Sequence, residues 1–221
     1  MPQPSLADQV STFNEGFTAQ IGPDLSAVFD GEQTALRAAG QPDGRVVVGD
    51  RLPAAELRDA AGAPVALADV LDGAVSVLVF YRGAWCPYCN LTLRTYQQDL
   101  LPELTARGVR LVAVSPQTPE ASEQSVANGS LAFPVLTDPA NVFAAALGIV
   151  TEPSQDARRA HRELGFDVAD SNADETARVP FPSVLVVDGD GVVRFVDVQV
   201  DYTVRTEVPT IIAAVDTLRL D

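Results

Sequence analysis

The sequence predicts an α/β protein in which a central mixed β-sheet is flanked by helices on both faces. Two observations support this fold class. From residue 74 onward, apolar runs rich in β-branched residues alternate with segments of helical periodicity. Near the end of the chain, two such runs at 183–188 and 191–198 are joined by the turn DGDG, which predicts a closing β-hairpin. The length of 221 residues suits one domain with additions.

The chain is predicted to begin with a helical extension, residues 1–44. Apolar residues recur at helical spacing before and after Pro23, so we expect two short amphipathic helices that end at Gly40. These apolar residues are Val10, Phe13, Phe17, Ile21, Leu25, Val28 and Phe29. The segment QPDGR, 41–45, is typical of a turn, and the main domain is expected to span 45–221. The extension is expected to cap this domain or to serve a homodimer.

The first half of the main domain contains the expected central strand. Residues 57–67 predict a hairpin and 68–71 a short helical turn. The run 74–81 is apolar at successive positions, as in a strand that is buried on both faces. The segment 90–108 has the spacing of a helix, which Pro102 is expected to kink.

The second half continues the alternation and contains one irregular segment. Further strands are expected at 109–115, 133–138, 183–188 and 191–198, and further helices from Thr118, over 139–148 and over 208–218. Residues 151–178 are polar and charged, without a strong period. We expect an insertion there, part helix over 155–164 and part loop. His161 is flanked by arginines in that helix and is expected to be solvated.

Composition excludes several classes of function. The formal net charge of −15 argues against nucleic acid and anionic membrane surfaces as partners. All 15 basic residues are arginine, so Schiff-base chemistry on lysine is excluded. The N-terminal residues show no signal-peptide pattern, and the apolar run 75–81 is too short to span a bilayer. We therefore expect a cytoplasmic protein, and in that reducing setting a cysteine pair is more often catalytic or metal-binding than structural.

Both cysteines lie in the stretch FYRGAWCPYCN, where a predicted strand runs into a predicted helix. Cys86 is placed at the helix N-terminus, whose unpaired N–H groups favour a thiolate. Pro87 suits the first helical position, and Cys89 follows one turn later. We expect Cys86 to be the nucleophile and Cys89 the resolving thiol. A zinc site needs four ligands, which two thiols and His161 do not supply, so no metal is expected.

Four further residues are candidates for this site. Arg82 would stabilise a thiolate or polarise a peroxide oxygen, although it would also suit an ordinary strand end. Trp85 would shield Cys86 and shape access to it. Pro182 heads a buried strand, which fits a cis bond that would bring the Phe181 backbone beside Cys86 for substrate pairing. A trans proline at the strand start is the alternative, and Pro180 is the competing candidate for the cis bond.

Five segments together resemble the peroxiredoxin-like branch of the AhpC/TSA family, which belongs to the thioredoxin-fold superfamily. They are FYRGAWCPYCNLTLRTYQ, VAVSPQTPE, FPVLTD, VPFPSVLVVDGDG and DYTVRTE. The resemblance covers about 45–210 and implies a thioredoxin-like fold with a redox centre at Cys86 and Cys89. It also implies a cis proline at Pro182 and a thioredoxin-like or glutathione-type reductant. No bound cofactor is expected, because the two cysteines hold the electrons.

The family's peroxide-activating motif, P-x-x-x-T-x-x-C, is altered in this chain. Counted back from Cys86, the Thr and Pro positions hold Gly83 and Val79; counted from Cys89, they hold Cys86 and Arg82. The dipeptide between the cysteines is the one familiar from glutaredoxins. Because the resembling segments extend well beyond the cysteine pair, we expect a thiol peroxidase in which a hydroperoxide oxidises Cys86 and Cys89 resolves it to a disulfide. The alternatives are a thiol–disulfide oxidoreductase and a redox-sensing binding module.

Overall fold

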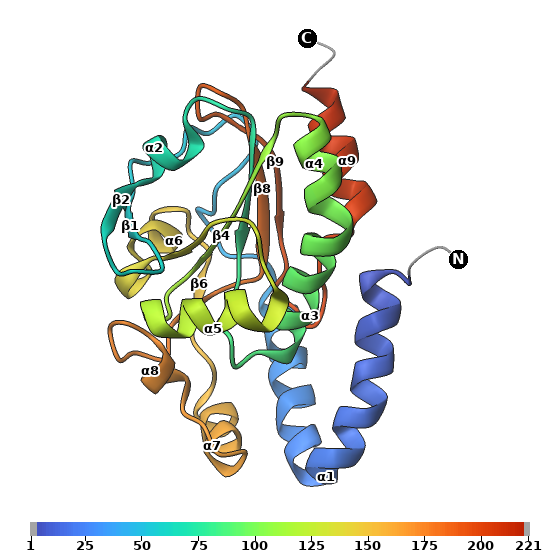
Figure 1. Cartoon of the computed structure of the whole chain (residues 1–221). Helices are drawn as coiled ribbons and strands as arrows, with labels where there is room; N and C mark the ends of the chain where they lie inside the picture. Colours follow the sequence, from blue (N-terminus) through green and yellow to red (C-terminus); the bar gives the residue numbers. More distant parts are fainter. Residues whose placement is uncertain (1–3, 219–221) are drawn as a thin grey trace.

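A computed structural model describes residues 4–218, which form a seven-stranded mixed sheet with helices on both faces (Figure 1). The strand order is β2-β1-β5-β4-β3-β8-β9. The strands are β1 (Glu56–Arg58), β2 (Pro64–Ala66), β3 (Ser76–Phe80), β4 (Arg110–Ser115), β5 (Val135–Thr137), β8 (Ser183–Val187) and β9 (Val193–Val198). A separate ribbon pairs β6 (Val150–Thr151) with β7 (Val179–Pro180). The predicted fold class is confirmed.

Strand β3 occupies the middle of the sheet, parallel to β4 and antiparallel to β8. Its alternate side chains enter two separate cores: Val77 and Val79 face one core, and Leu78 and Phe80 face the other. Every residue of β3 is buried, which agrees with its apolar sequence. The end of this strand is therefore a rigid base for the residues that follow it.

Helices cover the two faces unequally. One face holds α3 (Pro87–Thr95), α4 (Leu101–Ala106) and α9 (Val208–Thr217), with α5 (Pro119–Gly129) beside α3 (Figure 1). The other face holds α2 (Leu67–Leu71) and α6 (Val142–Ala146), the latter preceded by a 3₁₀ turn, Pro139–Asn141.

The helix that follows the cysteines is interrupted before Pro102, as the sequence predicts. A π-helical turn, Tyr96–Leu100, separates α3 from α4, and Pro102 lies in the first turn of α4. Proline has no N–H for the helical ladder, and its ring crowds the carbonyl four residues earlier. The helix therefore widens there instead of continuing regularly.

The extension forms helix α1 (Leu6–Ala39), which is broken at Gly22. Gly22 has φ +81° and ψ 169°, outside the helical region, and Pro23 starts the second half. Figure 1 shows the two halves folded back as a V at one end of the molecule. Two amphipathic segments that end at Gly40 are thus confirmed.

The segment 151–178 contains α7 (Gln155–Glu163) and α8 (Val168–Ser171). The expectation that His161 is solvated is wrong, because its side chain is 6% exposed. It packs between Phe29 of α1 and Phe166. Within the described residues, no helix has the length and apolarity needed to cross a membrane.

Candidate active site

The two cysteines lie where the sequence predicts, between β3 and α3. Cys86 is the residue that caps α3, Pro87 occupies the first turn, and the backbone N–H groups of Cys89 and Asn90 both donate to the Cys86 carbonyl at 3.1 Å. Both cysteines are free thiols, with exposures of 1% for Cys86 and 0% for Cys89. Either sulfur is therefore reached only through the protein interior.

The loop before Cys86 is fixed by a buried glutamine that the sequence reasoning did not select. Gln117 accepts from the N–H of Ala84 at 2.7 Å and donates to the hydroxyl of Tyr81 at 2.7 Å. Gly83, at φ +148°, lies so close to Trp85 that a Cβ would meet the indole nitrogen at 2.6 Å. Gln117 lies in the segment VAVSPQTPE, one of those that resemble the family, and this resemblance could have indicated its importance.

Cys89 is the thiol that the charges of the site favour as thiolate. Burial would raise its pKa, but the hydrogen bond from Cys86, the charge of Arg205 and the backbone N–H of Arg82 together lower the pKa to about 5. Arg205 places its Nη2 3.5 Å from the Cys89 Sγ. Arg205 lies in the segment DYTVRTE, and its role was not predicted from the sequence.

Cys86 keeps its proton in the same arrangement. Burial raises the pKa of its thiol, and the hydrogen bond and negative charge of Cys89 raise it further. The charges of Arg82 and Arg205 only partly oppose this. The sequence predicts that the helix N-terminus favours a thiolate on Cys86; in the structure the two thiols form a coupled pair, and Arg205 beside Cys89 favours the negative charge there.

The loop that presents Arg205 is held by buried polar contacts. Tyr96 donates from its hydroxyl to the carbonyl of Thr206 at 2.6 Å, and Thr206 donates to Asp197 of β9 at 2.8 Å. The Arg205 guanidinium also donates to the carbonyls of Tyr202 and, at 2.7 Å, Val204. Its position beside Cys89 is thus set by contacts with β9, with the π-helical turn and within its own loop.

We expect Tyr96→Phe to lower the free energy of unfolding by about 1–3 kcal/mol, because it leaves the buried Thr206 carbonyl unpaired. The loosened loop should also raise the pKa for alkylation of Cys89, measured by iodoacetamide labelling across pH. Ser76→Ala is the matched control, because the Ser76 hydroxyl donates to the Ala74 carbonyl at 2.9 Å at the start of β3, the end of that strand remote from the cysteines. An unchanged alkylation profile in Tyr96→Phe would show that the loop is held by other contacts.

The charge of Arg82 acts on both thiols, and its side chain is 4% exposed. Its guanidinium carbon is 4.8 Å from the ring centre of Trp85 and 4.1 Å from that of Tyr202. Among the described residues it forms no ion pair, and its Nε has no hydrogen-bond partner in the protein. The two rings occupy its flanks, so the edge of the guanidinium is what remains for another molecule.

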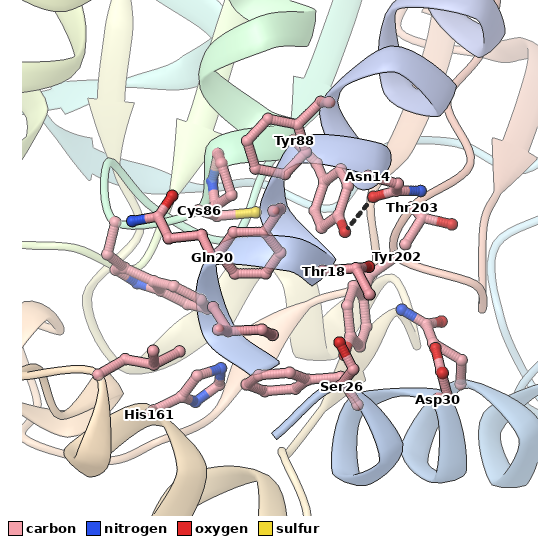
Figure 2. A pocket seen from close by; sticks show the side chains of 18 of the residues that line it. Asn14, Thr18, Gln20, Ser26, Asp30, Cys86, Tyr88, His161, Tyr202 and Thr203 are labelled. Carbon is pink, nitrogen blue, oxygen red and sulfur yellow. Dashed lines mark hydrogen bonds between the residues drawn. The ribbon is translucent and has the colours of Figure 1, made fainter. Parts of the chain in front are cut away.

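Cys86 borders a cavity of about 550 Å³, whereas Cys89 borders only a small one of about 10 Å³. The large cavity lies among both halves of α1, the start of α3, α7 and the loop at 202–203. Figure 2 shows Cys86, Tyr88, His161 and Tyr202 on its wall. Cys86 is therefore the thiol that an incoming molecule meets.

Phe181 and Pro182 do not form the predicted substrate platform. No cis peptide bond occurs in the described part of the chain, so the Phe181–Pro182 bond is trans and neither Pro182 nor Pro180 has the cis form. The Phe181 N–H donates to the Ile149 carbonyl and the Pro182 carbonyl accepts from Gln199, so this backbone is already paired. Pro182 borders the small cavity next to Cys89, and Phe181 lies in the core.

The described residues were also compared with the requirements of a metal site. Within the residues that the structure describes, no group of three or more His, Cys, Asp or Glu side chains is placed to hold a metal ion.

Comparisons with known proteins place this arrangement in context. The AhpC/TSA family model matches residues 48–196, more than half of the chain. A Mycobacterium tuberculosis protein named "Putative peroxiredoxin Rv2521" is 36% identical over 95 residues, which cover 43% of this chain and 59% of that protein. The match thus spans less than two thirds of this relative's length.

Solved structures show the same fold at low sequence identity. Peroxidoxin BcpB from Mycobacterium tuberculosis aligns with a TM-score of 0.59 at 21% identity, over 78% of this chain and 97% of that one. Reduced Prx3 from Vibrio vulnificus, solved in complex with hydrogen peroxide, aligns with a TM-score of 0.62 at 21% identity, over 76% and 98%. These alignments confirm the thioredoxin-like fold that the sequence resemblance implies.

Proposed function

This chain belongs to the AhpC/TSA family, and we propose that it is a thiol-dependent peroxidase in which Cys86 is oxidised and Cys89 resolves it. The single observation that supports this most is the difference between the surroundings of the two thiols. Cys86 borders the large cavity, and Cys89, beside Arg205, bears the negative charge. One thiol is thus placed to meet the oxidant and the other to accept its proton.

The first step is the attack on the peroxide. Cys86 donates a hydrogen bond to Cys89, so its proton passes to the Cys89 thiolate as the Cys86 sulfur attacks one oxygen of the hydroperoxide. The S–O bond forms, the O–O bond breaks, and Cys86 becomes a sulfenic acid. The other oxygen leaves as an alcohol or water with the proton returned from the pair, and Cys89 is again a thiolate.

The second step closes the disulfide. The Cys89 thiolate attacks the Cys86 sulfur, the S–S bond forms, and hydroxide leaves and takes up a proton to become water. Two thiols have then been oxidised and one hydroperoxide reduced. A thioredoxin-like or glutathione-type thiol would return the pair to the reduced state by exchange, which requires a reducing compartment such as the cytoplasm. A homodimer stays a prediction.

Arg82 would replace the peroxide-activating residues that the sequence motif lacks. Its guanidinium is buried, has no ion-pair partner among the described residues and borders the cavity with Cys86. A guanidinium edge donates two parallel hydrogen bonds, which suit the two oxygens of a hydroperoxide. The donors would stabilise the charge that develops on the leaving oxygen.

Thiol–disulfide exchange is the second candidate, and the C-P-Y-C pair with Cys86 toward the cavity favours it. A substrate disulfide would be attacked by Cys86 and released by Cys89. The paired backbone of Phe181 and Pro182 argues against this function, because it leaves no free strand edge beside the thiols for a substrate chain.

Stopped-flow fluorescence of Trp85, the one tryptophan in the chain, distinguishes these two functions. Trp85 borders the cavity beside Cys86, so oxidation of the pair should change its emission. Reduced protein would be mixed with hydrogen peroxide, an organic hydroperoxide, or a small disulfide. A fast change with peroxide and a slow one with the disulfide supports the peroxidase. Peroxide consumption no faster than that by a free thiol would overturn it.

A further inference from the structure

The cavity next to Cys86 is much larger than a peroxide group requires. Its volume of about 550 Å³ lies within the range of about 300–1,000 Å³ that is usual for sites of organic ligands. The first half of α1 and the loop at 202–203 form one part of the wall, and the second half of α1 and α7 form another. The cavity is therefore large enough for a small organic molecule and not only for a peroxide group.

Aromatic side chains form most of the apolar wall. His161 lies 4.9 Å from Phe166 and 5.4 Å from Trp85, measured between ring centres, and Trp85 lies 5.5 Å from Phe166. Elsewhere on the wall, Phe13 in the first half of α1 contacts Tyr88 of α3 edge-to-face, with 5.3 Å between ring centres. The remaining faces and edges of such rings pair favourably with a further aromatic ring, offset-stacked or edge-to-face. The lining thus favours an aromatic ligand over a flexible alkyl chain.

Several buried polar atoms on this wall have no hydrogen-bond partner in the protein. The side chains of Gln33, Arg82, His161 and Tyr202 are each more than nine-tenths buried, and each contributes at least one such atom. Burial of these atoms without a partner is unfavourable. All four residues border the same cavity. Their convergence indicates that the ligand has polar atoms as well as a ring.

Arg82 determines the charge that the ligand needs. Of the residues on the wall, Arg82 and Asp30 are charged, and Asp30 is exposed at the rim, where water screens it (Figure 2). His161 is neutral at pH 7, because burial and the charge of Arg82 lower its pKa to about 4. The negative charge on Cys89 is already shared with Arg205. Glu32 is a buried carboxylate that borders a separate cavity of about 10 Å³ with Arg82 and Tyr202, and it accepts from the N–H of Ser154 at 2.8 Å. The buried charge on the wall of the large cavity is therefore that of Arg82.

We propose that this cavity binds a small aromatic carboxylate, with its ring among the aromatic side chains and its carboxylate on the edge of Arg82. A guanidinium binds a carboxylate through two parallel hydrogen bonds, and the unpaired Arg82 offers that edge within the cavity. Gln33 and His161 supply further partners for polar substituents. The bound molecule lies against Cys86, so it should also slow the oxidation of Cys86 by peroxide. The proposal concerns the reduced protein and does not rest on peroxidase activity.

The test titrates reduced full-length protein with 1-naphthoate, followed by calorimetry and by quenching of Trp85 fluorescence. We expect saturable binding of one molecule, and at least about tenfold weaker binding of the neutral 1-naphthamide, since the charge-assisted pair is lost. Octanoate, which retains the charge but lacks the ring, should also bind more weakly. These comparisons use the unaltered protein, so no folding defect enters.

Variants then locate the site. Arg82→Gln should weaken 1-naphthoate binding at least about tenfold, and Gln33→Leu should weaken it less. Arg94→Gln is the matched control, because Arg94 lies on α3 outside the cavity and donates to the Asn128 carbonyl. Thermal unfolding of each variant confirms that it is folded.

Two results would overturn the proposal. Equal affinities for 1-naphthoate and 1-naphthamide would exclude recognition of the carboxylate by Arg82. A lack of saturable binding at millimolar concentration would mean that water alone satisfies the polar atoms of the cavity. Peroxide consumption by the same samples is measured separately. A protein that reduces peroxide but does not bind 1-naphthoate refutes only this inference, and the reverse result refutes only the proposed function.

Discussion

Replacing Cys86 with serine is expected to lower the rate of peroxide reduction by about a thousandfold or more, because the reacting sulfur itself is lost. Cys89 remains in that variant, but its sulfur borders only a small cavity of about 10 Å³. The rate is measured by peroxide consumption and by the Trp85 fluorescence change. Both thiols are buried, so the substitution removes an atom that the oxidant reaches through the large cavity alone.

The matched variant is Cys89→Ser, which keeps Cys86 but removes its base and its resolving partner. We expect one slow oxidation of Cys86 to a sulfenic acid, trapped by dimedone and located by mass spectrometry, without a disulfide. If Cys86→Ser instead formed a sulfenic acid on Cys89 at the rate of the unaltered protein, then Cys89 would be the residue that attacks. The roles assigned to the two cysteines would have to be exchanged.

Arg205→Met is expected to shift the pH dependence of the reaction upward. In the unaltered protein the pKa of Cys89 is about 5, so the charged pair forms as pH rises through 5 and persists above it. Without the guanidinium the pKa should rise toward the ordinary value of about 8.5. At pH 7 the pair would then be largely protonated, and the rate should fall about tenfold or more and recover near pH 9. A rate profile across pH measures this directly.

Arg194→Met is the control for that experiment, because Arg194 pairs with Asp188 at the surface, remote from the thiols. The stability of the reduced protein offers an independent readout. Since the folded pKa of Cys89 lies below its unfolded value, its contribution to stability is lost as pH falls toward 5. The raised pKa of Cys86 has the opposite effect at alkaline pH, so stability is compared between pH 5 and 8. Arg205→Met should flatten this dependence. Identical profiles for the variant and the unaltered protein would show that Arg205 does not set the charge of the pair.

Local pattern was sufficient to predict the framework of the molecule. Strand β3 is apolar at every position, and the cysteines follow it at the start of a helix, so both the buried strand and the placement of Cys86 were visible in the sequence. The break in α1 was similarly marked by Pro23, which follows the non-helical Gly22, and the turn between β1 and β2 by Gly62. These features depend on residues that are neighbours in the chain.

Contacts between distant segments were not visible. Arg205 is 116 positions from Cys89, and nothing local indicates that its guanidinium meets that sulfur. The burial of His161 could have been predicted from helical spacing, but the arginines next to it in the sequence suggested an exposed position. Ala157, Ala160 and His161 share one helical face and are all buried, while the neighbouring arginines point elsewhere. Helical spacing, rather than the residues directly adjacent, would have predicted its burial.

The prediction of a cis bond before Pro182 was wrong for a related reason. A proline at the head of a buried strand suits both isomers, and the choice depends on what pairs with the backbone around it. Here Gln199 bonds the Pro182 carbonyl and Ile149 bonds the Phe181 N–H. These partners lie in different parts of the chain, and the trans bond accommodates both.

Helix α1 forms part of the cavity wall but contributes neither of the two thiols. The family match begins at residue 48, whereas α1 ends at Ala39, so the helix pair that roofs the cavity lies outside the shared segment. The reacting thiols, Arg82 and Arg205 belong to other parts of the chain. Substitutions in α1 can therefore change which molecules reach Cys86 while the redox pair is left intact. The part of the cavity wall formed by α1 can thus vary independently of the two sulfurs, whereas Arg82, which borders the cavity and acts on both thiols, links ligand recognition to reactivity.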